Sequence, residues 1–306
     1  MLNEYKIAIT GASGWVGKNL IVSLFEKINK NNFKKNVFLY ASKSKSITIN
    51  SELNNLKIKK ISDFYSDSLK NNFNIVFHCA FIVREYIDKL GISNYIKNND
   101  EITNIVLKGI KKTNNCKLIL FSSGAAAPYE KLVSNEVLEK DPYGVLKRKD
   151  EILFNEHIET QVMRIYALTG RHIRTPHRFA ISNFILQAKQ NSRIIFKSKR
   201  RIVRGYINAK DLADLSILIS INKSNFNKYQ ILNSVSEEID LLELAQLVSN
   251  NFNQIPVFSA IEKDLSDEVY SASPNKMRLI SKELNYKLKN IDEQIIDTIL
   301  GLNNKN

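Results

Sequence analysis

Three glycines, each separated from the next by two residues, constrain the fold of this chain more than any other feature. Gly11, Gly14 and Gly17 follow the apolar run Ile7–Ile9 and precede a helical pattern over residues 18–25. Glycines at such a turn let the backbone bend sharply and approach an anion closely, and the next helix offers free N–H groups and the positive end of its dipole. The pattern predicts a strand, a turn and a helix that bind the pyrophosphate of a dinucleotide.

The spacing GxxGxxG differs from the general GxGxxG fingerprint, so an ordinary strand–helix turn is the alternative. Strand and helix signals continue to alternate through the first half, which is typical of a parallel sheet with crossover helices. The strand signals are Ile7–Ile9, Val37–Tyr40, Ile75–Cys79, Leu118–Phe121 and Val162–Tyr166, and the helical patterns include Ile102–Ile110 and Val145–Phe154. We therefore expect an α/β fold, a Rossmann doubly wound parallel sheet with helices on both faces.

A second, smaller lobe is expected to follow the sheet. The chain has 306 residues, of which 43% are hydrophobic, so it can bury a substantial core. Residues 171–204 are basic and interrupt the strand–helix rhythm, and residues 237–306 have mainly helical patterns. The expected division is an NAD(P)-binding Rossmann domain of residues 1–168 and 205–236, and a C-terminal α/β substrate-binding lobe of residues 169–204 and 237–306.

Composition narrows the function classes. No apolar run is long enough to span a membrane and the N-terminus has no signal-peptide pattern, so we expect a cytoplasmic protein. Cys79 and Cys116 have no metal-ligand spacing and are expected to be core residues in a reducing compartment. The net charge of +14 is compatible with nucleic acid, but it suits an anionic nucleotide substrate equally well.

The end of the second strand bears on the choice of cofactor. The segment from Tyr40 to Lys45 contains no carboxylate that could accept the ribose hydroxyls of NAD. The hydroxyl of Ser42 and the ammonium of Lys43 suit a 2′-phosphate, which slightly favours NADP over NAD; a solvated loop is the alternative. Asp63 could accept from the adenine amino group, or it could cap a helix.

Two further segments carry groups suited to proton transfer. Ser122 and Ser123 end the fourth strand signal, and Tyr143 and Lys147 lie four residues apart at the start of a helix, on one face. A free phenol has a pKa of about 10, and a neighbouring ammonium lowers it. Such a tyrosine can exchange a proton with a sugar hydroxyl. A Tyr-x-x-x-Lys pair alone is common on solvated helices. A glycine turn, a Ser-Ser strand end and then this pair, in that order, are much less common.

With these segments the sequence resembles the extended short-chain dehydrogenase/reductases of the nucleotide-sugar epimerase/dehydratase group, over nearly the whole chain. The matching segments are Thr10–Gly17 (TGxxGxxG), Phe77–Ala80 (HxAA), Asn99 with Thr103 (N-x-x-x-T), Arg164–Gly170 (R-x-x-N-x-x-G), Arg204–Ala213 (R-D-x-x-x-V-x-D-L-A) and Gln230–Asn233 (YNVG). The resemblance implies an NAD(P)-dependent enzyme that acts at C4 of a nucleotide-diphosphate sugar, without a metal, as a homodimer.

The resemblance also implies residue roles. Tyr143 transfers the proton, Lys147 lowers its pKa and holds the nicotinamide ribose, and Ser123 orients the substrate oxygen. Arg204 contacts the diphosphate of the substrate. Together with the residues at the end of the second strand, the expected cofactor-binding residues are Gly11, Ser13, Gly14, Trp15, Val16, Gly17, Ser42, Lys43, Asp63, Ala80, Tyr143 and Lys147.

Departures from the family pattern limit the reaction. Gly124 stands where the family commonly has a serine or threonine; Ser123 is the best substitute, because Ser122 points to the opposite face of the strand. Gly124 and Ala125 also replace the Asp-Glu pair of sugar 4,6-dehydratases, which disfavours dehydration and decarboxylation. Ala167 replaces an asparagine of the family. A 4-keto reductase and a 4-epimerase both remain open.

Other features keep alternatives open. The charge, Gly124 and Ala167 are compatible with a non-catalytic dinucleotide-binding protein of the same fold that binds RNA or a protein partner. His172 and His177 could supply an extra acid for a double epimerisation, or they could be loop contacts. A basic cluster could hold the diphosphate, or it could be a solvated loop; its members are Arg193, Lys197, Lys199, Arg200, Arg201 and Arg204.

Overall fold

The computed structural model describes residues 2–129, 135–262 and 265–303, and the chain forms two units. The first comprises residues 1–164 and 216–232, and the second comprises residues 165–215 and 233–306. This division differs from the expected one for three segments, which pack with the second unit because strand β10 pairs with the short strands of that unit. The three segments are residues 165–168, 205–215 and 233–236.

An eight-stranded sheet in the order β11-β7-β6-β5-β1-β2-β4-β3 forms the centre of the first unit. The strands are β1 (Ile7–Thr10), β2 (Val37–Ala41), β3 (Lys45–Ile47), β4 (Leu56–Lys60), β5 (Ile75–His78), β6 (Lys117–Ser123), β7 (Thr160–Ile165) and β11 (Ile231–Ser234). Strand β1 pairs in parallel with β2 and with β5, whereas β3 is antiparallel to β4. The strand order reverses direction at β1, so the carboxyl ends of β1 and β5 border the crevice where ligands of such sheets bind.

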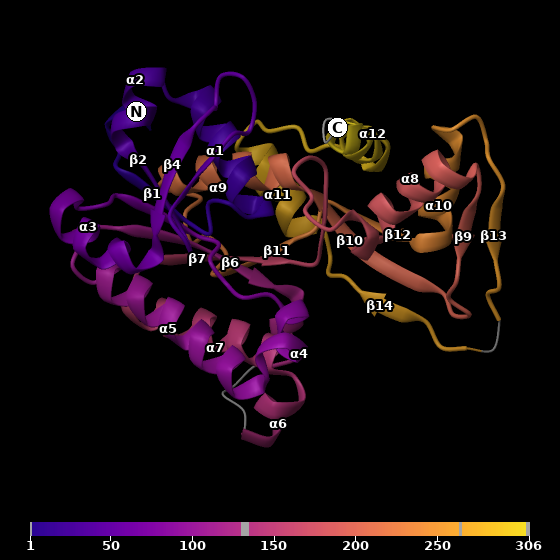
Figure 1. Cartoon of the computed structure of the whole chain (residues 1–306), viewed down its shortest axis with the longest axis horizontal. Coiled ribbons are helices and arrows are strands. Elements are labelled where there is room, and N and C mark those ends of the chain that lie inside the picture. The colour runs from indigo at the N-terminus through magenta and orange to yellow at the C-terminus, as the bar shows by residue number, and fades with distance from the viewer. Residues whose placement is uncertain (1, 130–134, 263–264, 304–306) are drawn as a thin grey trace. The chain divides into compact units, whose positions relative to one another are not determined.

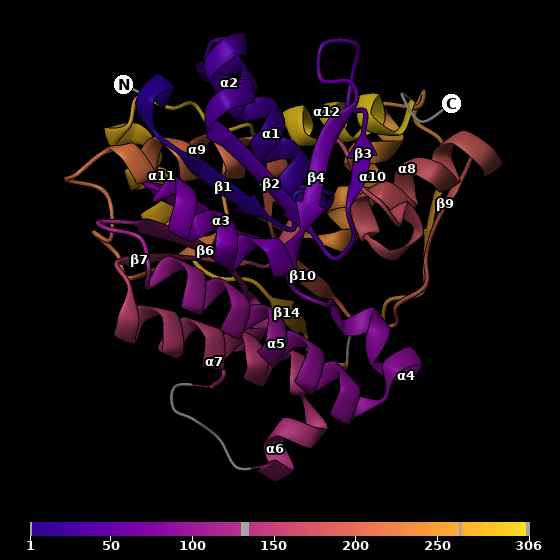
Figure 2. The ribbon, with the colours of Figure 1, turned by 60° about the vertical axis from the view of Figure 1, so that its left-hand side comes forward.

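Helices cover both faces of this sheet, as Figures 1 and 2 show: α3, α5 and α7 lie on one side, and α1 and α2 on the other. The helices are η1 (Leu2–Glu4), α1 (Trp15–Lys27), α2 (Lys30–Asn36), η2 (Ile61–Asp63), α3 (Phe64–Asn71), η3 (Arg84–Tyr86), α4 (Ile87–Leu90), α5 (Ile92–Ile110), η4 (Gly124–Ala126), α6 (Asn135–Lys140) and α7 (Pro142–His157). Apolar side chains such as Phe64, Val106 and Phe154 fill the core against the sheet. The expected doubly wound sheet is confirmed.

The second unit contains short strands and five α-helices within its described residues, together with one short 3-10 helix. Strand β10 pairs with β8, β12 and β14, and β9 pairs with β13. The elements are β8 (Ala167–Thr169), η5 (Pro176–Arg178), α8 (Ala180–Asn191), β9 (Ile194–Phe196), β10 (Ile202–Asn208), α9 (Ala209–Ile221, which continues into the first unit), β12 (Glu237–Asp240), α10 (Leu241–Asn250), β13 (Val257–Ser259), β14 (Glu268–Tyr270), α11 (Asn275–Glu283) and α12 (Ile291–Asn303). Among all described residues, no helix is long and apolar enough to cross a membrane.

Candidate active site

The glycine turn joins β1 to α1 in the expected place. Gly11 has φ +72°, and a Cβ atom there would lie 2.7 Å from the backbone nitrogen of Ala80 and 2.9 Å from the carbonyl oxygen of Cys79. A Cβ on Gly17 would lie 2.4 Å from the carbonyl oxygen of Gly11. The turn therefore packs directly on the chain that leaves β5, and it requires glycine at both positions.

The middle glycine of the turn is different, and its surroundings fit a pyrophosphate. Among the described atoms, a Cβ on Gly14 would meet within 4 Å only the carbonyl oxygen of Gly11, at 3.1 Å. Gly14 is also the N-cap of α1, so no side chain covers the start of this helix from the cap position. Ser13 lies in the turn, and Trp15 and Val16 open the helix. A side chain at position 14 would fill the space through which an anion reaches the helix N-terminus.

Exposed polar residues surround the carboxyl end of β2. Ser42 and Lys43 directly follow the strand and are exposed. In the parallel pairing of β2 with β4, Ala41 lies opposite Lys60, so a second lysine stands at the same edge of the sheet. Asp63 occupies the N-cap position of α3, yet its side chain makes no capping hydrogen bond and its carboxylate is exposed.

The two serines at the end of β6 have different partners. The Ser122 hydroxyl donates to Oε1 of the buried Glu151 at 2.6 Å, and the same carboxylate accepts from Arg148 at 2.9 Å and from Arg164 at 2.6 Å. The Ser123 hydroxyl instead accepts from the N–H of Ala125 at 3.2 Å and begins the 3-10 helix η4. Ser122 is thus committed to a buried ionic cluster, whereas Ser123 lies at the turn that leaves the sheet.

Tyr143 and Lys147 lie against one shared neighbour. The rings of Tyr143 and Phe81 are nearly perpendicular, with 5.7 Å between their centroids, and the Lys147 ammonium lies 3.9 Å from the centroid of the Phe81 ring. Lys147 also donates from Nζ to the carbonyl oxygen of Phe121 at 3.0 Å. Burial lowers the pKa of Lys147 to about 8, a shift that the carboxylate of Asp150 opposes.

The first turn of α7 packs directly on η4, the turn that begins at Ser123. A Cβ on Gly144 would lie 2.5 Å from the carbonyl oxygen of Ala125 and 2.8 Å from the Tyr129 ring. Since Lys147 bonds the strand two residues before Ser123 and Gly144 packs two residues after it, Ser123 lies between the anchor points of the helix that carries Tyr143. These contacts bring the three expected catalytic residues into one region of the first unit.

Helix α5 supports this region through the two residues of the N-x-x-x-T pattern. The Asn99 amide oxygen accepts from the N–H of Ile82 at 2.8 Å and so holds the loop after β5. The Thr103 hydroxyl donates to Oδ1 of Asp150 at 2.8 Å, and burial raises the pKa of that carboxyl to about 6. Sequence reasoning missed Asp150, although its position three residues after Lys147 on a helix indicates proximity.

Arg204 lies in β10 of the second unit and has an acidic partner. Its guanidinium bonds the Glu268 carboxylate and lies 6.0 Å from the centroid of the Tyr270 ring. Other members of the basic cluster are paired as well: Lys199 with Glu262 at 2.9 Å, and Arg201 with Asp240 at 3.0 Å and with Asp267 at 2.8 Å. The assignment of Arg204 to a diphosphate stays a prediction, and a diphosphate would have to displace Glu268.

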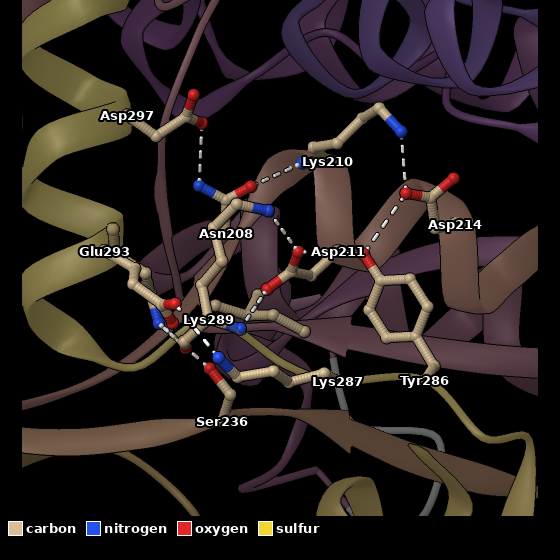
Figure 3. A network of polar contacts seen from close by, with 12 residues as sticks. Asn208, Lys210, Asp211, Asp214, Ser236, Tyr286, Lys287, Lys289, Glu293 and Asp297 are labelled. Atoms are coloured by element: carbon tan, nitrogen blue, oxygen red, sulfur yellow. Dashed lines mark hydrogen bonds and ion pairs between the residues drawn. The ribbon is translucent and has the colours of Figure 1, made fainter. Parts of the chain in front are cut away.

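Asp211, the aspartate of the Arg204–Ala213 segment, takes part in a hydrogen-bond network of the second unit. Asp211 is buried and accepts from the Tyr286 hydroxyl at 2.9 Å, from the Lys289 N–H at 2.8 Å and from the Lys289 ammonium at 2.6 Å (Figure 3). Asp214 also accepts from Tyr286, at 3.1 Å, and from Lys210, at 2.7 Å. Asp211 therefore ties the segment before α12 to the start of α9.

The remaining candidates are two loop histidines and two cysteines. His172 adopts φ +70° after Gly170, and His177 is exposed in η5. Cys79 and Cys116 are free thiols. Within the described parts of the chain, no group of three or more histidines, cysteines, aspartates or glutamates is arranged to hold a metal ion.

Comparison with known families decides the classification. The model of the family described as "NAD dependent epimerase/dehydratase family" matches residues 7–233. The chain belongs to this family of enzymes. The resemblance drawn from the sequence motifs is thereby confirmed, and the glycine turn and the Tyr143–Lys147 pair both lie inside the matched range. No curated protein sequence matches the chain.

Solved structures share the fold at low sequence identity. A UDP-N-acetylglucosamine 4-epimerase from Methanobrevibacter ruminantium, in complex with UDP-N-acetylmuramic acid, is 18% identical with a TM-score of 0.73 over 99% of each chain. A UDP-glucose 4-epimerase from Stenotrophomonas maltophila, with bound NAD and formylated UDP-arabinopyranose, is 15% identical with a TM-score of 0.72 over 98% of each chain. An NAD-dependent NDP-hexosamine 5,6-dehydratase, TunA, is 14% identical with a TM-score of 0.71 over 98% of each chain. Both reaction classes of the family therefore occur on this fold.

Proposed function

We propose that this enzyme acts at C4 of a nucleotide-diphosphate sugar, either as a 4-epimerase that inverts C4 or as a 4-keto reductase that reduces a ketone there. The observation that supports this choice is the position of Ser123 between the anchor points of the helix that carries Tyr143 and Lys147. Dehydratase chemistry also needs a carboxylate after the strand-end serine to move protons at C5 and C6. This chain has Gly124 and Ala125 there.

In the proposed mechanism, Tyr143 holds and moves the proton. The Tyr143 phenolate accepts the C4 hydroxyl proton when the carbonyl forms, and the phenol returns it when the hydroxyl forms again. Lys147 favours the phenolate through its positive charge, and Ser123 donates to the substrate oxygen. A bound nicotinamide dinucleotide supplies the hydride acceptor and donor.

Replacing Tyr143 with phenylalanine tests the assignment. The Phe variant keeps the ring that packs on Phe81 but loses the transferable proton, so turnover should fall by about 10²–10⁴-fold. Binding of dinucleotide and of sugar nucleotide, measured by calorimetry, should stay within a few-fold of wild type. Tyr65→Phe, on the exposed surface of α3, is the matched control. Turnover by Tyr143→Phe close to that of wild type would remove Tyr143 from the mechanism.

We further propose NADP as the preferred dinucleotide. Ser42, Lys43 and Lys60 place hydroxyl and ammonium groups at the end of β2, where a 2′-phosphate would lie. Ser42→Asp should weaken NADP binding through repulsion between like charges and leave NAD binding equal or stronger. Fluorescence titration of both dinucleotides against both proteins gives the four affinities. A wild-type preference for NAD would overturn this part of the proposal.

A further inference from the structure

One charged side chain beside Tyr143 has no part in the mechanism above. The Arg84 guanidinium lies over the face of the Tyr143 ring, 5.1 Å from its centroid. Arg84 comes from η3, in the loop after β5, and its Nη2 donates to Oδ1 of Asp141 at 3.0 Å. The Arg84 guanidinium therefore faces Tyr143, the proposed proton carrier, from an element other than the helix that carries Tyr143.

The same contact fixes where that cation lies. Asp141 is the N-cap of α7, where its Oδ1 accepts from the N–H of Gly144 at 3.2 Å. The other oxygen, Oδ2, accepts from the Tyr129 hydroxyl at 2.9 Å. The Arg84 side chain is 59% exposed, and its partner Asp141 is held by the first turn of α7 and by Tyr129. This ion pair therefore holds the guanidinium beside Tyr143, two residues after the cap.

We propose that Arg84 is a positioning residue that favours the ionised phenol of Tyr143, an inference that rests on the proposed function. Loss of the phenol proton spreads negative charge over the oxygen and the ring. A guanidinium on the ring face therefore attracts the phenolate more strongly than the neutral phenol. Arg84 thus acts as a second cation, and it keeps its charge at every pH at which the enzyme folds.

The environment of Lys147 adds to this argument. Burial lowers the pKa of Lys147 to about 8, so above that pH a growing share of the lysine is neutral and no longer favours the phenolate. Among the described residues, the charged and titratable groups near Tyr143 include Arg84 over its ring and Tyr95, which interacts with it electrostatically. They also include Lys147 on the same helix, and Asp141 and Tyr129, which are bonded to each other. Asp141 opposes the two cations, so loss of Arg84 would also leave that carboxylate without its cationic partner.

Titration of the Tyr143 phenol measures this effect without any substrate. The ultraviolet absorbance change of phenol ionisation is recorded against pH, and Tyr143 is isolated as the difference between a protein and its Tyr143→Phe partner. Arg84→Met should raise the Tyr143 midpoint by about 0.5–1 pH unit. Asp141→Asn, which keeps a good N-cap residue but removes the negative charge, should lower it by a similar amount. The double variant should return close to wild type, and Arg84→Lys should lie between wild type and Arg84→Met.

A purely structural role for Arg84 predicts a different result, namely equal midpoints in wild type and Arg84→Met, and that result would overturn the proposal. The double variant discriminates further, because repair by a second charge change needs an electrostatic cause. The pH profile of kcat/KM for alcohol oxidation should move by the same amount as the absorbance midpoint. If Tyr143→Phe keeps its turnover, the proposed function fails, while the absorbance titration still decides whether Arg84 shifts the phenol.

Discussion

Ser122 and Ser123 are neighbours in sequence, yet their hydroxyls serve different purposes. Ser122 donates to the buried Glu151, and Ser123 begins the turn η4, on which α7 packs. Ser122→Ala should therefore lower the free energy of unfolding by about 1–2 kcal/mol and leave turnover within a few-fold of wild type. Ser123→Ala should lower turnover at least tenfold with little loss of stability. Urea denaturation and initial rates, measured on both variants, test these two predictions. The reverse pattern would assign the structural role to Ser123 and the catalytic role to Ser122.

The ion pair between Arg204 and Glu268 bears on the prediction that Arg204 binds a diphosphate. A charge-assisted hydrogen bond contributes about 1.5–3 kcal/mol, so Arg204→Ala should weaken binding of a nucleoside diphosphate by at least tenfold. Glu268→Gln should strengthen it a few-fold, because the competing carboxylate is gone. Arg200→Ala, on the exposed loop before β10, is the milder control. Equal calorimetric affinities in wild type and Arg204→Ala would show that the diphosphate is held elsewhere.

At the scale of elements, the docking of α7 on η4 sets the place of Tyr143. Gly144→Ala adds a Cβ that would lie 2.5 Å from the Ala125 carbonyl oxygen, so the first turn must shift. Because small displacements of a catalytic group cost up to about 10²-fold in rate, turnover should fall by that order. Gly109→Ala, in α5, is the matched control: its Cβ would lie 2.6 Å from the Phe64 ring, which costs stability but not turnover. Similar rates for both variants would contradict this account.

The elements that the sequence predicts well are those with continuous apolar runs. Strands β1, β5 and β6 are buried along nearly their whole length, so apolar residues dominate them, and the buried polar side chains of Thr10 and His78 bond each other. The strands of the second unit have three to seven residues and several are half-exposed, so residues 237–306 look mainly helical although they also contain β12, β13 and β14. Local sequence patterns predict a strand well when burial determines its residues. They do not predict a strand that forms because it pairs with distant strands.

At the scale of the whole molecule, the same limit applies to the candidate site. Tyr143 and Lys147 could be predicted together because four residues on one helix bring them to one face. Arg84 lies 57 residues before Asp141, and Glu268 lies 64 residues after Arg204, so no local pattern joins either pair. The sequence also could not predict to which unit β10 belongs, because this depends on its pairing with strands distant in the chain.

The position at which the sugar changes is the most direct test of the account. Wild-type protein is incubated with NADP or NADPH and a panel of nucleotide-diphosphate hexoses and 4-keto hexoses, and the product is read by proton NMR. The account predicts a product altered at C4 alone, either inverted there or reduced from the ketone, and formed at least about 100-fold more slowly by Tyr143→Phe. Loss of water across C5 and C6, or an unchanged panel in a folded protein that binds the dinucleotide, would contradict it.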